Sequence, residues 1–201
     1  MPIGPKARPA RVPVTAKGEE PGVAERLLKT RTVLLSSEVS PTVAQKVIER
    51  LLILEADDPD APITMLVNSP GGEVHSGFAV YDVIRFIRPP VRIVCTGLTA
   101  SIATIILLAV DKENRVALPN ARLLIHQPLF SGEVFGPASD LEITANEILK
   151  TKEHINRVIA EATGHSISKV QRDTERDFWL SADEAVAYGL VSRVIKSRAD
   201  L

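Results

Sequence analysis

Residues 63–72 of the chain read ITMLVNSPGG. The first five are mostly apolar or β-branched and predict a strand, and the polar residues, proline and paired glycines that follow predict a sharp turn. After the turn, apolar side chains recur every three residues, as in a helix, at Phe78, Tyr81, Ile84 and Ile87. The pair Pro89-Pro90 ends that helix. The stretch therefore predicts a strand–turn–helix unit with a glycine turn at the carboxyl end of the strand.

Short strands and helices alternate along the rest of the chain. Strands are predicted over residues 32–35, 91–96, 116–118, 123–125 and 191–195. Helices are predicted after Ser40, over about 100–110, over 139–163 and after Ser181, with serine N-caps and a capping box to Glu184. Repeated units of this kind predict an α/β fold with a mainly parallel sheet. Functional sites in such folds form at the carboxyl ends of strands, where glycines mark two turns, 69–72 and 97–101.

Length and composition indicate one folded domain. The chain has 201 residues, 45% of them hydrophobic, and a formal net charge of −1. This charge gives no electrostatic case for binding nucleic acid or an acidic membrane surface. The longest apolar stretch, residues 102–110, is too short to span a bilayer. A single cysteine, Cys95, excludes an intrachain disulfide and fits a reducing compartment, so we expect a cytoplasmic protein.

The beginning of the chain differs from the remainder. Residues 1–22 contain five prolines and three glycines and show little apolar periodicity. This composition predicts a flexible arm or loop. We therefore expect one domain over residues 23–201, preceded by the arm.

Three residue types that could form a catalytic set stand near predicted strand ends. Ser101 follows a strand in a turn of small residues, where it is either a nucleophile or simply a helix N-cap. His126 follows strand 123–125 and is either a general base or a histidine held by local backbone. An aspartate of the run 173–177 could orient the histidine, although such charged runs are more often solvated. Spacing alone does not distinguish Asp173 from Asp177.

The paired glycines could serve the same chemistry. Gly71 and Gly72 could offer backbone N–H groups to an oxyanion, because glycine lets the backbone approach a ligand closely. A phosphate cradle is the rival interpretation, but neither the P-loop spacing nor G-x-G-x-x-G is present. No cluster has zinc-like spacing, so we expect neither a metal nor a bound cofactor. His75, just after the glycines, is expected near the site without acting in it.

Several motifs in one order resemble the proteolytic subunit of the Clp protease, the ClpP family. The resemblance covers roughly residues 26–195. The matching segments include residues 52–59 (LILEADDP), 68–72 (NSPGG), 100–101 (AS), 125–128 (IHQP) and 172–177 (RDTERD).

The resemblance implies a role for each candidate residue. Ser101 corresponds to the nucleophile, His126 to the general base and Asp177 to the orienting acid of a serine endopeptidase that cleaves unfolded polypeptides. The backbone N–H groups of Gly72 and Ile102 correspond to the oxyanion hole. The implied fold is a ClpP/crotonase-like spiral of βα units with a protruding handle helix.

The resemblance also implies partners. Two stacked seven-membered rings would enclose a chamber, fed by an AAA+ unfoldase that uses ATP, so that this subunit itself needs no cofactor. No nucleic-acid or membrane partner is expected.

The chain departs from the family pattern in four places, one of which is the N-terminal arm, where residues 22–28 lack the family's aromatic-rich segment. Ile102 and Ala103 stand where the family usually has Met-Gly, and the loop over residues 129–137 is longer than usual. Thr64 and Leu66 correspond to positions that are aromatic in the family's unfoldase-docking pocket.

These departures leave two alternatives open. One is a non-catalytic or specialised ClpP paralogue that acts in mixed rings. The other is a crotonase-type acyl-CoA enzyme, which the presence of serine, histidine and aspartate together disfavours.

Overall fold

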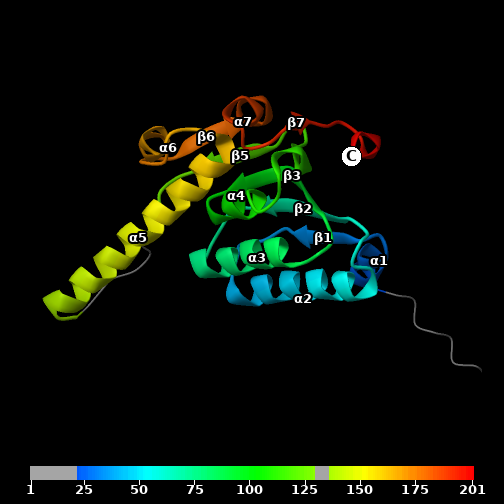
Figure 1. Ribbon diagram of the computed structural model, residues 1–201, viewed down its shortest axis with the longest axis horizontal. Coiled ribbons are helices and arrows are strands. Elements are labelled where there is room, and N and C mark those ends of the chain that lie inside the picture. The colour runs from blue at the N-terminus through cyan, green and yellow to red at the C-terminus, as the bar shows by residue number, and fades with distance from the viewer. Residues whose placement is uncertain (1–21, 130–135) are drawn as a thin grey trace, which may run out of the picture.

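The computed structural model describes residues 22–129 and 136–201. Figure 1 shows a sheet with helices packed against it and one long helix that projects away from it. The helices are α1 (Val23–Lys29), α2 (Pro41–Asp57), α3 (Val74–Phe86), α4 (Ile102–Leu107), α5 (Ala138–Thr163), α6 (Ile167–Asp173) and α7 (Ala182–Tyr188). The expected arm, residues 1–22, lies outside the described residues except for Gly22, as do residues 130–135 of the loop expected to be long.

The sheet is mainly parallel, as predicted. Its main path runs β1-β2-β3-β4-β7, and β5 and β6 extend it from β3. Every pairing is parallel except that of β5 with β6. The strands are β1 (Thr32–Leu35), β2 (Ile63–Ser69), β3 (Val91–Ala100), β4 (Arg115–Ala117), β5 (Arg122–Ile125), β6 (Phe178–Ser181) and β7 (Arg193–Val194). The α/β class with a parallel-dominated sheet is therefore confirmed.

Strand β3 is longer than predicted, because it changes partner along its length. Ile93–Cys95 pairs with β4, and Leu98–Ala100 pairs with β5. The predicted turn over residues 97–101 was therefore wrong over most of its length. Leu98 also donates its N–H to Oδ1 of Asn68 at 2.8 Å. A Cβ on Gly97 would lie 2.5 Å from that oxygen, so a larger residue here would displace the Asn68 side chain.

Two apolar clusters lie on opposite faces of β2. The alternate residues Ile63, Met65 and Val67 are fully buried in the main core, which helices α2, α3 and α4 share. This alternation is the period-two pattern of a strand. Leu66 faces the other way and packs in a small cluster with Val94, Val116, Ile195, Leu118 and Leu201.

Helix α5 agrees within one residue with the predicted helix 139–163. It ends at Gly164, whose φ of +77° provides the left-handed C-cap that favours glycine. Its C-terminal half is buried at Ile155, Val158 and Ile159. Its N-terminal half projects from the body (Figure 1) and exposes Leu141, Ile143 and Leu149.

Some elements were not predicted. Helices α1 and α6 and strand β6 are additional, and the predicted strand 191–195 is only two residues long, as β7. The capping box before α7 is confirmed, with Ser181 and Glu184 bonded to each other's backbone N–H. Within the described ranges, no helix is long and apolar enough to cross a membrane.

Candidate active site

Ser101 has a strained backbone at the junction of β3 and α4. Its φ of 57° and ψ of −129° place it in a region that side chains other than glycine rarely adopt. Its N–H donates to the carbonyl of Leu124 and its carbonyl accepts from Thr104, both at 2.9 Å. Its hydroxyl makes no cap hydrogen bond to α4, so the interpretation of Ser101 as a simple side-chain N-cap is not supported. Strain of about 1–3 kcal/mol persists only where neighbours enforce it, and such positions cluster at functional sites.

The paired glycines form a tight turn between Ser101 and Val39. Gly71 has a φ of +94°, and a Cβ there would lie 2.6 Å from the Cβ of Ser101. Gly72 has a φ of +147°, and a Cβ there would lie 2.3 Å from the carbonyl oxygen of Val39. Glycine at position 71 thus allows the turn after β2 to approach Ser101 this closely, and glycine at position 72 allows the same turn to lie against Val39. Ile102 is the first residue of α4, so its N–H has no acceptor within the helix.

His126 follows β5 and lies beside Asp177. Its Nδ1 is 3.7 Å from Oδ1 of Asp177, and within the described chain this buried nitrogen has no hydrogen-bond partner. The side chain of His126 is 10% exposed and that of Asp177 is 62% exposed. The structure shows no hydrogen bond between Ser101 and His126 among the residues it describes. The serine, histidine and aspartate are therefore not hydrogen-bonded to one another in this structure.

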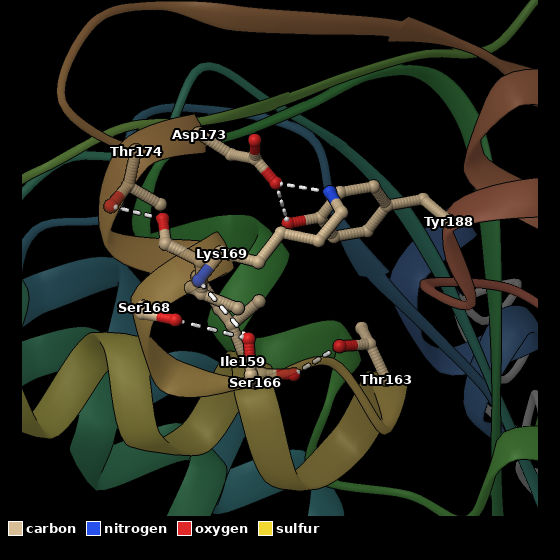
Figure 2. A network of polar contacts seen from close by, with 9 residues as sticks. Ile159, Thr163, Ser166, Ser168, Lys169, Asp173, Thr174 and Tyr188 are labelled. Atoms are coloured by element: carbon tan, nitrogen blue, oxygen red, sulfur yellow. Dashed lines mark hydrogen bonds and ion pairs between the residues drawn. The ribbon is translucent and has the colours of Figure 1, made fainter.

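Asp173 has different partners from Asp177. One carboxylate oxygen of Asp173 accepts from Tyr188 at 2.7 Å and pairs with Lys169 at 2.5 Å (Figure 2). Partial burial alone would raise the pKa of Asp173, but the bonds from Lys169 and Tyr188 outweigh it and lower this pKa. Burial, and then the bond to Asp173, raise the pKa of Tyr188 well above its usual value. The structure thus places Asp177, and not Asp173, next to His126.

A cavity of about 800 Å³ joins these residues. All five predicted site residues line it, namely Gly72, Ser101, Ile102, His126 and Asp177. His75 also lines it and is exposed, near the site as expected. Much of the wall is apolar and comes from Ile105, Leu124, Ile125, Pro128, Leu129, Ile155 and Ile159.

Sequence reasoning missed part of this wall. Ile155 and Ile159 belong to α5, and their helical spacing indicates only that they are buried, not what they face. Glu38 and Glu73 also line the cavity. Glu73 caps α3 by accepting from the N–H groups of His75 and Ser76. Partial burial alone would raise the pKa of Glu73, but the hydrogen bonds from His75 and Ser76 outweigh it and lower this pKa.

The described residues contain no group of three or more histidine, cysteine, aspartate or glutamate side chains that could hold a metal ion. A strained serine, a nearly buried histidine and a carboxylate line one cavity, and these are groups that can take part in nucleophilic acyl transfer.

Comparison with protein families identifies the group to which the chain belongs. The model of the Clp protease family matches residues 17–198, nearly the whole chain. The chain therefore belongs to the Clp protease family and is a peptidase of the ClpP kind. The resemblance inferred from the sequence motifs is confirmed.

Proposed function

We propose that this chain is a serine endopeptidase with Ser101 as nucleophile, His126 as general base and Asp177 as orienting acid. The observation that carries the proposal is the positive φ of Ser101, which presents its side chain to the cavity that His126 and Asp177 also line. A strained serine that makes no cap bond is better explained by a reacting hydroxyl than by a role in helix capping.

In the proposed mechanism, Nε2 of His126 accepts the hydroxyl proton while Oγ of Ser101 bonds to the scissile carbonyl carbon. The carbonyl oxygen becomes an oxyanion that accepts from the N–H groups of Gly72 and Ile102. His126 then donates the proton to the leaving amine as the C–N bond breaks. Water attacks the resulting ester, again with His126 as base, and releases the second peptide and the serine. Asp177 accepts from Nδ1–H and stabilises the imidazolium.

The cavity suits an apolar side chain of the substrate next to the cleaved bond. Its apolar wall includes Ile102, Ile105 and Ile159, which would exclude water around such a side chain. An extended, unfolded polypeptide could present one side chain at a time to this cavity.

We further propose that the chain works as a ring-forming subunit. The exposed apolar residues Leu141, Ile143 and Leu149 on the projecting half of α5 suit contact with a second copy, so that α5 serves as the handle between two stacked heptameric rings. An AAA+ unfoldase would supply substrates and consume ATP, and this subunit would need no cofactor. The cytoplasm is the expected location.

The surface of β2 around Thr64 and Leu66 suggests a specialised member of the family. Thr64 and Leu66 are half-buried on β2, and neither is aromatic. A docking pocket built on them would keep apolar surroundings but lose flat surface for stacking. We therefore propose that the chain docks an unfoldase weakly by itself and works best in mixed rings with a second ClpP-type paralogue.

The deciding experiment is labelling with a serine-reactive peptide phosphonate and localisation of the adduct by mass spectrometry. The adduct is expected on Ser101, and Ser101→Ala should abolish both labelling and peptide cleavage, with a loss of about 10⁴-fold or more. An intact assembly without labelling or cleavage would favour the non-catalytic paralogue. Turnover of an acyl-CoA that survives Ser101→Ala would favour the crotonase-type alternative.

A further inference from the structure

Thr174 is a completely buried polar residue at the C-terminal end of α6, three residues before Asp177. Its N–H donates to the carbonyl of Val170 at 2.9 Å. Its hydroxyl donates to Oδ1 of Asn156 at 2.8 Å or to the carbonyl of Val170 at 2.9 Å. Its carbonyl accepts from the N–H of Gln127, the residue after His126, at 2.6 Å. One residue thus joins α5, α6 and the segment that carries the candidate base.

A second set of contacts holds Glu175, the residue after Thr174, between the same two segments. Nε2 of Gln127 donates to the carbonyl of Glu175 at 2.8 Å. The carboxylate of Glu175 accepts from Nζ of Lys152 at 3.0 Å. Lys152 and Asn156 are four residues apart on α5, on one face of the helix. The backbone of residues 174–175 is therefore held between α5 on one side and Gln127 on the other.

Asn156 and Thr174 form a polar pair in an otherwise apolar part of the core. Asn156 is 1% exposed and Thr174 is 0% exposed, and their neighbours Ile155, Ile159 and Val170 belong to the apolar core. Burying such a pair is costly, and two apolar side chains of similar shape would be about as stable. Nδ2 of Asn156 has no hydrogen-bond partner within the described residues, which adds to the cost. The pair is therefore better explained by the fixed geometry of its hydrogen bond than by a contribution to the free energy of unfolding.

We propose that Thr174, held by Asn156, is a positioning residue that sets the separation of His126 and Asp177. The chain on one side of this contact leads to His126 and on the other to Asp177, and their side chains are 3.7 Å apart. Because that distance is just beyond hydrogen-bond range, a shift of under about 1 Å in either segment decides whether the bond forms. Errors of about 1 Å cost on the order of 100-fold in rate. The proposal rests on the catalytic roles given above to these two residues.

The test is a kinetic comparison of variants in the assembled protein. Thr174→Val keeps the shape and removes the hydroxyl, and we expect kcat for a peptide to fall about 10- to 100-fold with KM changed less than about twofold. Labelling of Ser101 by the phosphonate should slow in parallel. Thr174→Ser restores the hydroxyl and should recover kcat to within about threefold of the wild-type value.

A double variant separates positioning from stability. Thr174→Val with Asn156→Leu sets two apolar side chains against each other and should recover the unfolding midpoint, but not kcat. It also carries the test if Thr174→Val alone does not fold. Thr163→Val is the matched control, because the Thr163 hydroxyl donates to the carbonyl of Ile159 within α5 at 2.7 Å (Figure 2) and not toward Gln127. Its kcat should match the wild type.

Two results would overturn the proposal: wild-type kcat in Thr174→Val, or recovery of kcat together with stability in the double variant. If Ser101→Ala is inactive in the same assay, either result rejects the positioning role alone. If Ser101→Ala keeps its activity, the catalytic assignment is wrong and the positioning role falls with it.

Discussion

Nδ1 of His126 lies 3.7 Å from Oδ1 of Asp177, beyond the range of about 2.7–3.2 Å for an N–H···O hydrogen bond. The imidazole is nearly buried, whereas the carboxylate side chain is 62% exposed. The aspartate is therefore the partner with more freedom to move. A small movement of Asp177 toward the imidazole would form the histidine–aspartate hydrogen bond of the proposed triad.

The first prediction distinguishes the two aspartates. Asp177→Asn should lower turnover of a peptide by about 10⁴-fold, because an amide cannot stabilise the imidazolium or hold the required tautomer. Asp173→Asn should affect the chemistry much less, since Asp173 is bound to Lys169 and Tyr188. Both variants should keep the particle size in light scattering. The reverse ranking of the two turnover numbers would show that the acid is Asp173.

The second prediction concerns the glycine turn. Gly72→Ala would drive a methyl group toward the carbonyl of Val39, 2.3 Å away, and displace the N–H assigned to the oxyanion. Loss of one such donor costs about 10²–10³-fold in kcat. Gly164→Ala is the matched control, because it has the same kind of positive φ, +77°, with nothing within 4 Å of the added Cβ. The control should lose some stability but keep its kcat, and an equally active Gly72→Ala would exclude Gly72 from the oxyanion site.

The third prediction concerns assembly through α5. Leu149→Glu replaces one of the exposed apolar side chains of the projecting half with a charge and should reduce both particle size and peptidase activity. Glu142→Gln changes a charge on the same half without altering those apolar side chains, and should leave the particle unchanged. Light scattering with a parallel activity assay makes the comparison. A fully active monomer would contradict the proposed ring contact.

The fourth prediction concerns the unfoldase. The homomeric particle, given an AAA+ unfoldase from the same organism and ATP, should degrade a tagged folded substrate slowly. Loss of two aromatic contacts costs about 1–3 kcal/mol per docked loop, although several loops docking together can mask part of this loss. Thr64→Tyr with Leu66→Phe should speed degradation, while cleavage of a short peptide stays the same. Efficient degradation by the unmodified homomeric particle would remove the need for a paralogue.

The fifth prediction concerns the stability contributed by Asp173. Its pKa is lowered in the folded state, so its stabilisation is complete above the unfolded-state pKa of about 3.9 and is lost as pH falls through the folded-state pKa. At neutral pH, Asp173→Asn should reduce the free energy of unfolding by about 1–3 kcal/mol. Urea unfolding between pH 7 and pH 3 should show this difference shrinking only at the acid end. A difference that stays constant to pH 3 would show that the charge of Asp173 is not what stabilises the fold.

Local features of the fold could be predicted from sequence because their causes lie within a few residues. The stop of α5 at Gly164 and the capping box of Ser181 with Glu184 depend on side chains and backbone groups at most four positions apart. The strand over residues 63–69 depends on its own run of apolar and β-branched residues. These elements agree with the predictions to within a residue or two.

Long-range pairing explains what the predictions missed. Residues 98–100 look like a turn in sequence, but β5 supplies hydrogen-bond partners some 24 positions further on and keeps them extended. Strand β6 looks like the end of a charged loop, yet it pairs antiparallel with β5, more than 50 positions before it. A local pattern carries no information about such partners.

The candidate site shows the same division. By itself, the sequence determined the residue types and their order, a serine after β3, a histidine after β5 and paired glycines after β2, because strand ends and turns follow from local composition. Local spacing did not distinguish Asp173 from Asp177, and only the family resemblance favoured Asp177. The tertiary structure alone shows that Asp177 lies beside His126 and that α5 walls the cavity with Ile155 and Ile159. The physical reason is that both outcomes depend on how α5 and α6 pack against the sheet. That packing binds Asp173 to Lys169 and Tyr188 and leaves the next aspartate facing the histidine.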